Sequence, residues 1–326
     1  MELRSSYTLN DDFVPEIYYD RRACEPIVSY RRIKKEVYPE LKPVSSKPQV
    51  TKRKVAWVQD MMKRGGAEIS NELVVKVGID CGNEISLVTN FMDVSEIRSI
   101  LRESDLVIVN NIFHFSKDQI GEIKKILFAG KPYVKYDHDF RELRRPEFGR
   151  ELFRRSVLNV FISPFHRDEF RKELGVDGIC LPLAIDVDFF RPVSGIERKE
   201  KSVLALEKGA NIQWFIDENK DFSFTVVSDK PVNLNGGRLK VIPTLPYEKM
   251  PEVYSEHEYF LHFPEDSWPG DRVVFEAALC GCKVIMNEKV GHKSWGFNFD
   301  DIDGLRAILR KAPYEFWREI DRLVGV

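Results

Sequence analysis

The stretch PEDSWPGDRVVFEAALCGCKVIMNEKVG, at residues 264–291, decides the fold class of this chain. It follows the apolar run 259–263, which has the length of a buried strand and stops at a proline. Residues 271–281 have the apolar spacing of a helix and end in glycine, a frequent helix stop. Residues 283–287 are apolar enough for a second buried, parallel strand. Strand, polar loop, helix and strand in this order are half of a nucleotide-binding α/β unit.

The same alternation of apolar runs and helical patterns extends along most of the chain. It predicts an α/β protein with parallel, doubly wound sheets. The chain has 326 residues, 43% of them hydrophobic, which is enough to fill two cores of ordinary size. Besides the two strands above, we expect strands at residues 54–60, 84–89, 105–110, 133–136, 158–163, 179–183, 202–206, 222–228 and 239–243.

Composition limits the class of protein and its partners. The formal net charge is −2 and 31% of the residues are charged, a balance that argues against a general nucleic-acid binder, so we expect no nucleic-acid partner. The five cysteines are an odd number without CxxC spacing, which is typical of reduced core residues in a cytoplasmic protein. We find no signal-peptide pattern and no apolar run of membrane-spanning length. Peripheral contact with an anionic membrane is left open.

Residues 1–53 differ from the rest, with many prolines and tyrosines and two basic runs. Prolines at this density oppose long helices, while the tyrosines are too many for a disordered tail. We interpret the segment as an extended arm that packs on the body or on a partner, where it allows oligomerisation. A nucleic-acid-binding arm is the less favoured alternative, because acidic residues are interspersed.

Two loops follow predicted strands at the edge where parallel sheets bind ligands. Gly65 and Gly66 stand between a strand and a helix, where glycines allow close backbone approach and the helix start attracts phosphate. The loop before Arg272 precedes the helix of the opening stretch, and Glu276 follows one turn later. A carboxylate there can accept hydrogen bonds from ribose hydroxyls. The alternative is that Glu276 only caps or pairs on a surface helix.

Polar residues also follow the strand at 133–136. His138 stands between two aspartates at the carboxyl end of this strand, on the ligand side, although a lone histidine is more often structural. An arginine-rich segment comes next, and Arg141, Arg144 and Arg145 suit an anionic acceptor or lipid headgroups. The alternative is a solvated helix face whose arginines pair with Glu142, Glu147 and Glu151.

The motif RVVFEAALCGCKVI, starting at Arg272, resembles the C-terminal signature of retaining family-4 glycosyltransferases of the GT-B fold. The glycine loop GGAE at 65–68 and the segment LPLAIDVDFFRP at 181–192 are similar to other parts of that family. The resemblance implies two Rossmann-like domains facing a cleft, at 54–195 and 196–312, with a final helix at 313–326 that packs back on the first domain. In this comparison Glu276 matches the glutamate that holds the donor ribose.

The resemblance also implies roles for other residues. His138 matches a histidine close to the donor sugar, and Lys208, followed by glycine at the start of a helix, matches a lysine that binds the pyrophosphate. The family's nearby arginine is missing, and Arg272 is the candidate to replace it. We therefore expect His138, Lys208 and Arg272 to carry catalysis. The family's sugar-binding glutamate falls on Trp268, so the expected donor-binding set is Gly65, Gly66, Glu265, Asp266, Glu276 and Gly291.

The expected activity is retaining transfer of a sugar from a UDP- or GDP-linked donor to a glycan, a lipid-linked or another hydroxyl acceptor. The nucleotide sugar is a substrate, and we expect neither a cofactor nor a metal. A different GT-B enzyme, such as an epimerase or a phosphorylase, is one alternative. A catalytically silent subunit that binds nucleotide sugar or acts as a scaffold is the other, because Glu265 and Asp266 are displaced and the Lys208 loop is short.

Overall fold

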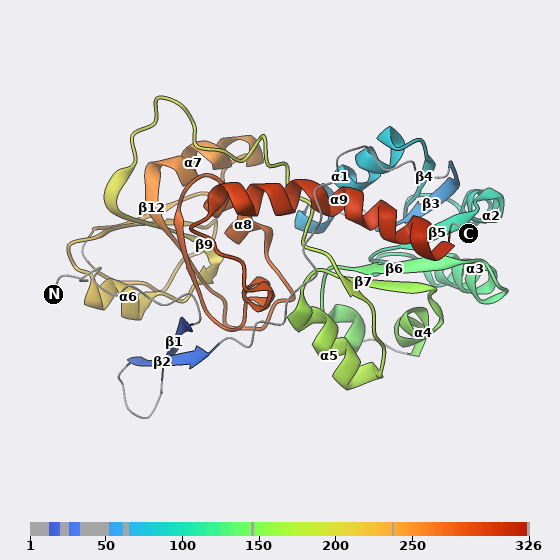
Figure 1. Cartoon of the computed structure of the whole chain (residues 1–326), viewed down its shortest axis with the longest axis horizontal. Helices are drawn as coiled ribbons and strands as arrows, with labels where there is room; N and C mark the ends of the chain where they lie inside the picture. The colour runs from blue at the N-terminus through green and yellow to red at the C-terminus, as the bar shows by residue number, and fades with distance from the viewer. Residues whose placement is uncertain are drawn as a thin grey trace. The chain divides into compact units, whose positions relative to one another are not determined.

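The computed structural model describes residues 13–19, 26–32, 52–60, 65–144, 147–236 and 238–324 (Figure 1). The chain separates into two compact units, Met1–Ser45 and Ser46–Val326. In the first unit, β1 (Phe13–Tyr19) and β2 (Pro26–Arg32) pair antiparallel. The predicted extended arm therefore contains a two-stranded ladder. Its packing on the body or on a partner stays a prediction, and Cys24 lies outside the described residues.

A six-stranded parallel sheet forms the first half of the second unit, in the order β4-β3-β5-β6-β7-β8. All four residues of β5 are buried because helices cover both faces of the sheet. The predicted alternation and parallel pairing are confirmed. The strands are β3 (Lys54–Val58), β4 (Glu84–Val88), β5 (Leu106–Val109), β6 (Tyr133–Asp137), β7 (Leu158–Phe161) and β8 (Ile179–Cys180).

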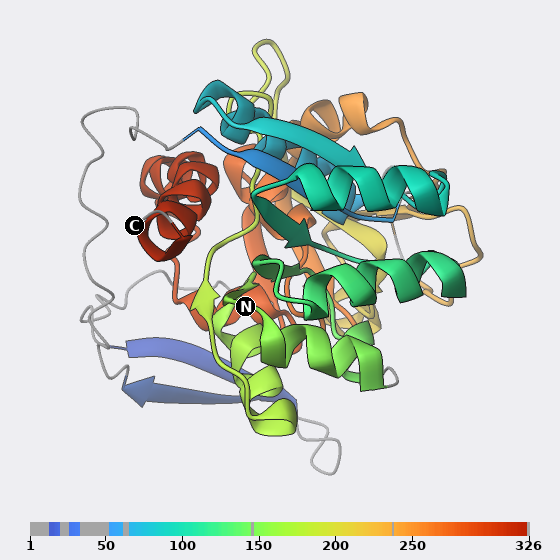
Figure 2. The same ribbon diagram turned by 90° about the vertical axis from the view of Figure 1, so that its right-hand side faces the viewer.

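The helices of this half begin where local side chains cap them. The Ser116 hydroxyl accepts a hydrogen bond from the N–H of Gln119 at the start of α3, and Ser163 does the same for His166 at the start of α5. Figure 2 shows α2 and α3 side by side over one face of the sheet. The helices are α1 (Gly66–Asp80), α2 (Val94–Glu103), α3 (Lys117–Phe128), α4 (Glu147–Arg155) and α5 (Pro164–Leu174).

A five-stranded parallel sheet forms the second half, in the order β11-β10-β9-β12-β13. Its central strand β9 (Lys199–Ala210) runs past Lys208 and Gly209, so the expectation that these residues open a helix is wrong. The next helix begins only at Gln213. The other elements are α6 (Gln213–Glu218), β10 (Ser223–Val227), β11 (Arg238–Ile242), α7 (Met250–Glu256), β12 (His257–Phe263), α8 (Arg272–Leu279) and β13 (Lys283–Met286).

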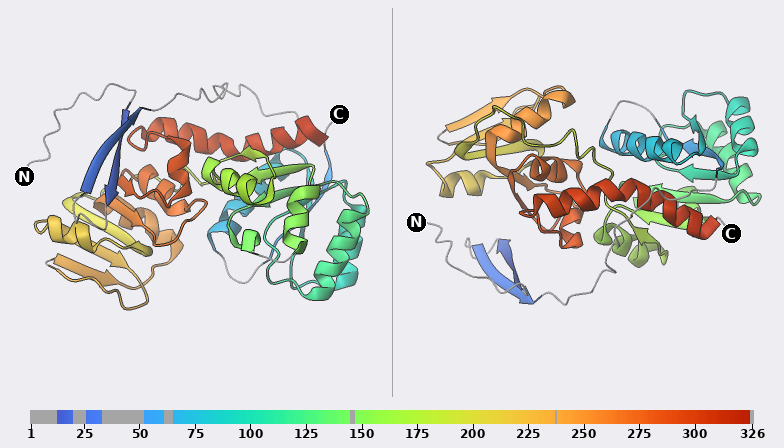
Figure 3. Two further views of the ribbon diagram at one scale, coloured as in Figure 1. Left: turned by 90° about the horizontal axis from the view of Figure 1, so that it is seen from below. Right: turned by 45° about the horizontal axis from the view of Figure 1, so that its top comes forward.

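Helix α9 (Ile302–Val324) connects the two halves (Figures 1 and 3). It is longer than the predicted final helix and contains Pro313. Arg306 donates to the carbonyl of Leu279, at the end of α8. Farther along, the Trp317 indole N–H donates to the carbonyl of Val74 in α1 at 2.8 Å. The helix thus packs against both the second half and the first half. The exact domain boundaries stay a prediction.

Candidate functional site

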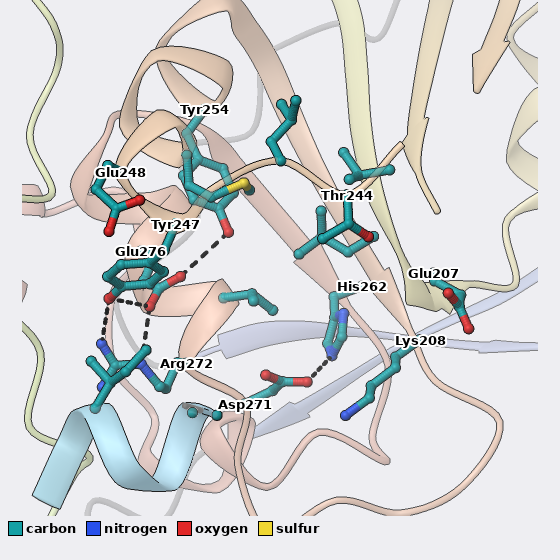
Figure 4. Close-up of a pocket in the computed structure, with 18 of the residues that line it drawn as sticks. Glu207, Lys208, Thr244, Tyr247, Glu248, Tyr254, His262, Asp271, Arg272 and Glu276 are labelled. Atoms are coloured by element: carbon teal, nitrogen blue, oxygen red, sulfur yellow. Dashed lines mark hydrogen bonds and ion pairs between the residues drawn. The ribbon is translucent and has the colours of Figure 1, made fainter. Parts of the chain in front are cut away.

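A cavity of about 740 Å³ lies at the carboxyl ends of the strands of the second sheet and opposite the start of α1 (Figure 4). This is the edge at which open parallel sheets bind ligands, and the volume suits a nucleotide-sized molecule. Its wall joins the glycine loop to the helix of the opening stretch, two regions far apart in sequence. Residues that line it include Gly65, Gly66, Leu206, Lys208, Val227, Thr244, Leu245, Tyr247, Tyr254, His262, Asp271, Arg272 and Glu276.

Glu276 lies on the wall of this cavity and is almost fully buried. Its carboxylate accepts hydrogen bonds from Arg272 Nε at 3.0 Å, Tyr247 OH at 3.3 Å and Tyr254 OH at 3.5 Å. Burial raises the pKa of Glu276, and the Arg272 charge opposes this rise. The carboxylate is thus held in a fixed position by three donors, as a group that recognises hydroxyls requires.

Arg272, at the first turn of α8, is also buried and links several elements. Its Nη1 donates to Ser70 Oγ in α1 at 2.6 Å and to the carbonyl of Ala184 at 2.8 Å. Its Nη2 donates to Tyr247 OH at 2.8 Å. Most donors of Arg272 are therefore engaged within the protein, in addition to its contact with Glu276. Arg272 therefore connects the two halves by hydrogen bonds and also lines the cavity.

Lys208 is exposed on β9 and lines the cavity, with Nζ 4.8 Å from the centre of the Trp268 ring. Nearby, the Asp271 carboxylate lies 3.2 Å from Nε2 of His262. Burial would raise the pKa of Asp271, but His262 and Lys208 together hold it below its usual value. A cation and an anion therefore stand side by side at this end of the cavity.

A second cavity, of about 360 Å³, adjoins the first one. The two share Gly65, Gly66, Lys208, Asp271 and Arg272. The second cavity is otherwise lined mainly by loops that follow strands of the first sheet. Its further residues include Asp60, Asn111, Phe113, His114, His138, Asp139, Arg141 and Trp268. Molecules bound in the two cavities would therefore lie next to each other, at the residues that both cavities share.

His138 lies in the second cavity, as expected for a residue at the carboxyl end of β6. Burial lowers the pKa of His138 to about 3, so the ring is neutral near pH 7. Neither ring nitrogen has a hydrogen-bond partner among the described residues. Unpaired buried polar atoms are costly and mark a position that a ligand can satisfy.

A buried charged cluster near His138 was not predicted from the sequence. Lys135 Nζ lies 3.0 Å from Glu142 Oε1 and 3.4 Å from Asp137 Oδ1, and all three side chains are buried. His166 Nε2 lies 3.6 Å from the other Asp137 oxygen. Burial raises the pKa of Glu142 to about 8, against the pull of Lys135. The expectation that Glu142 pairs with surface arginines is therefore wrong, because Glu142 faces the core.

The arginines of the segment that follows β6 differ in their surroundings. Arg141 lines the second cavity, forms an ion pair with Asp139 and stacks on the Phe113 ring at 4.8 Å. Arg155 pairs with Glu151 at 2.7 Å, as the alternative of a paired helix face requires. The Arg144 side chain, Arg145 and the Glu147 side chain lie outside the described residues.

Three predicted donor-binding residues lie outside both cavities. Glu265 and Asp266 are exposed, and Trp268 rather than either of them faces Lys208. Gly291 is a close-packing position, because a Cβ there would lie 2.0 Å from the carbonyl oxygen of Pro269. The N–H of Gly291 donates to the carbonyl of Trp268 at 2.8 Å. Gly291 thus allows the loop before α8 to pack closely.

Several lining residues were missed at the level of sequence. Thr244, Leu245 and Tyr247 follow β11, and His262 is near the end of β12, both on the ligand-binding edge of the sheet. The rule that ligands sit at carboxyl ends of parallel strands would have pointed to these positions. Tyr254 carries no such signal, since it reaches the cavity from α7.

Comparisons with known proteins bear on the fold. No protein-family model matches the chain, and no curated protein matches it. Among solved structures, an alpha-glucosyltransferase bound to UDP and a 13-mer DNA with an HMU base has a TM-score of 0.59 and 12% identity, covering 85% of this chain and 100% of that one. HepE from Anabaena, bound to UDP-glucose, has a TM-score of 0.54 and 13% identity, covering 84% and 98%. The fold is GT-B.

The GT-B fold confirms the expected architecture of two Rossmann-like sheets. The comparisons also correct one expectation. We expected no nucleic-acid partner from the net charge, and this exclusion is wrong, because alpha-glucosyltransferase structures of the same fold are bound to DNA. Net charge of a whole chain does not report on a local acceptor site.

We find no helix in the described part of the chain with the length and apolar character needed to span a membrane. The described side chains also include no group of three or more His, Cys, Asp or Glu residues arranged to hold a metal ion.

Proposed function

We propose that this protein is a glycosyltransferase that moves a sugar from a UDP-linked donor to a hydroxyl acceptor. One observation carries the proposal: the cavity of about 740 Å³ joins the glycine loop at Gly65 and Gly66 to Glu276 and Lys208 at the ligand-binding edge of the second sheet. Proteins of the same fold have been solved with UDP and UDP-glucose. The resemblance of the α8 motif to retaining enzymes supports retention of anomeric configuration.

In this proposal the nucleoside occupies the part of the cavity with apolar Leu206, Val227 and Leu245, and Glu276 accepts hydrogen bonds from the ribose. Lys208 and the N–H groups at the start of α1 stabilise the diphosphate as it leaves. The sugar then lies toward the wall shared with the second cavity, within reach of His138. Catalysis comes from positioning and from charge stabilisation of the leaving group.

A panel of UDP- and GDP-sugars tests donor binding by thermal shift. A ligand at about 100 times its dissociation constant adds roughly 2.7 kcal/mol to the free energy of unfolding. The bound donors are then incubated with glycan and DNA acceptors that carry free hydroxyls, and NMR of the product reports the anomeric configuration. No stabilisation by any nucleotide sugar would refute the donor site. An inverted product would refute retention alone.

The second candidate is a silent nucleotide-sugar-binding subunit. Trp268 at the position of the family's sugar-binding glutamate, with Glu265 and Asp266 outside the cavities, favours it. Saturable binding of a donor without transfer or hydrolysis would support this candidate and contradict ours.

A further inference from the structure

The second cavity contains an aspartate–histidine pair that the proposed donor site does not use. Asp60 follows β3, and His114 follows the neighbouring strand β5. Asp60 Oδ2 accepts the backbone N–H of Phe113 at 2.9 Å and of His114 at 3.2 Å, and it lies 2.8 Å from His114 Nδ1. An ionised carboxylate only accepts hydrogen bonds, so Nδ1 donates to it. In the neutral ring, the free lone pair is then on Nε2.

The histidine of this pair is accessible and the aspartate is buried, as is usual for a catalytic base and the group that orients it. The Asp60 side chain is 6% exposed, whereas the His114 side chain is 42% exposed. Among the described residues, no hydrogen bond to His114 Nε2 is found. A buried carboxylate therefore fixes the ring, and the unprotonated nitrogen is open to a ligand in the cavity.

The other carboxylate and histidine side chains that line this cavity either have a partner already or are too weakly basic. From α1, Glu68 accepts the N–H of Gly65 at 3.0 Å, and beyond β6 Asp139 is held by Arg141. From the second sheet, Asp271 is next to His262. Burial lowers the pKa of His138 to about 3, which makes its ring a poor proton acceptor near pH 7.

The walls of the cavity suit an organic acceptor. Phe113 and Trp268 supply aromatic surface, each already covered on one side by a cation. The wall shared with the donor cavity contains Lys208 and Asp271. A hydroxyl group held here is therefore next to the place where the donor sugar lies in the proposed function.

We propose that the second cavity is the acceptor subsite and that His114, oriented by Asp60, takes the proton of the acceptor hydroxyl at Nε2. This inference rests on the proposed function. The acceptor oxygen forms a bond to the anomeric carbon on the face from which the diphosphate leaves, as the proposed retention requires, while the bond from that carbon to the diphosphate oxygen breaks and its electron pair leaves with UDP. The acceptor proton passes to His114 and then to solvent. Asp60 acts as a positioning residue.

The test compares His114→Asn and His114→Ala with the wild type, using the donor and acceptor found in the panel above. Asn is the matched control for a structural role, because its amide N–H can still donate to Asp60 but it has no basic nitrogen. We expect transfer by both variants to fall by about 10²- to 10⁴-fold. Titration calorimetry should show unchanged affinity for UDP.

Asp60→Asn tests the positioning role. It should lower kcat for transfer and leave the KM for the donor unchanged, because the amide no longer fixes the reactive tautomer. Transfer by His114→Asn at close to the wild-type rate would overturn the assignment of the base. A parallel loss of UDP affinity would overturn it as well. Wild-type protein that transfers no sugar at all would instead refute the proposed function.

Discussion

Arg272 and Glu276 form a buried ion pair one helical turn apart, with Arg272 Nε 3.0 Å from Glu276 Oε1. The pair faces the larger cavity, and Arg272 also bonds Ser70 of α1. The lining of the larger cavity and the contact between the two halves therefore depend on one set of side chains.

The pair predicts a specific pattern of stability. Arg272→Met leaves Glu276 buried without its cation and should lower the free energy of unfolding by about 3 to 5 kcal/mol. The double variant Arg272→Met, Glu276→Gln should recover part of this loss, because no unpaired charge remains. Urea denaturation measures both. Equal losses in the single and double variants would mean that the pair itself is not what stabilises this region.

Glu276 should also determine affinity for the nucleotide. Glu276→Ala removes the acceptor for the ribose hydroxyls and should weaken UDP binding by about 1 to 3 kcal/mol, measured by calorimetry. Glu248→Ala is the matched control, since Glu248 lines the same cavity but is exposed. Equal effects of the two variants would argue for a general charge effect instead of a ribose contact.

His138 should act on the sugar and not on the nucleoside. His138→Ala should reduce turnover and leave the affinity for UDP nearly unchanged, because an interaction with the transferred group does not involve the nucleotide. Steady-state kinetics and UDP titration, carried out on the same preparation, measure the two quantities. Normal turnover in this variant would remove His138 from the site.

Glu142 should make stability depend on pH. Its pKa is about 8 in the folded protein, above its ordinary value of 4.5, so the folded state binds the extra proton between these pH values. This contribution to stability is fully present below pH 4.5 and is lost as pH rises through about 8. Chemical denaturation from pH 5 to 9 should therefore show Glu142→Gln gaining stability relative to the wild type as pH rises. A constant difference between the two would contradict the raised pKa.

Two glycines provide a matched pair of substitutions. A Cβ at Gly78 would lie 2.3 Å from the Trp317 ring, whereas a Cβ at Gly121 would meet nothing within 4 Å. Gly78→Ala should destabilise the protein by about 1 to 3 kcal/mol through overpacking. Gly121→Ala, in the interior of α3, should stabilise it by about 0.5 to 1 kcal/mol. Thermal denaturation measures both changes in stability, and a Gly78→Ala variant that loses no stability would show that the contact with α9 is unimportant.

The sequence predicted the elements well, because apolar runs and helix ends are local features. It failed at Lys208 and Gly209, where the lysine and glycine suggested the start of a helix. The structure places both in β9, and a Cβ at Gly209 would lie 2.2 Å from Nδ1 of His262. The glycine is there for close approach to a strand some fifty residues later, which no local pattern reveals.

Long-range pairing explains the other misses. Lys135 is a charged residue in a short strand and looks like an exposed strand position, yet it is fully buried because the Asp137 carboxylate neutralises it and Glu142 lies 3.0 Å away. His114 and Asp60 are far apart in sequence, so the spacing of residues gave no indication of their contact. Contacts between residues distant in the sequence, such as this one, cannot be read from local patterns.

The hydrogen bond from the Trp317 indole to the Val74 carbonyl has a consequence during protein synthesis. The two residues are 243 positions apart, and the Trp317 ring lies 6.4 Å from that of Trp57 in β3. Domains generally fold as the chain leaves the ribosome, starting from the N-terminus. Here the first sheet is translated long before the helix that covers Trp57, so the nascent domain exposes an aromatic surface that chaperones can bind until α9 has been made.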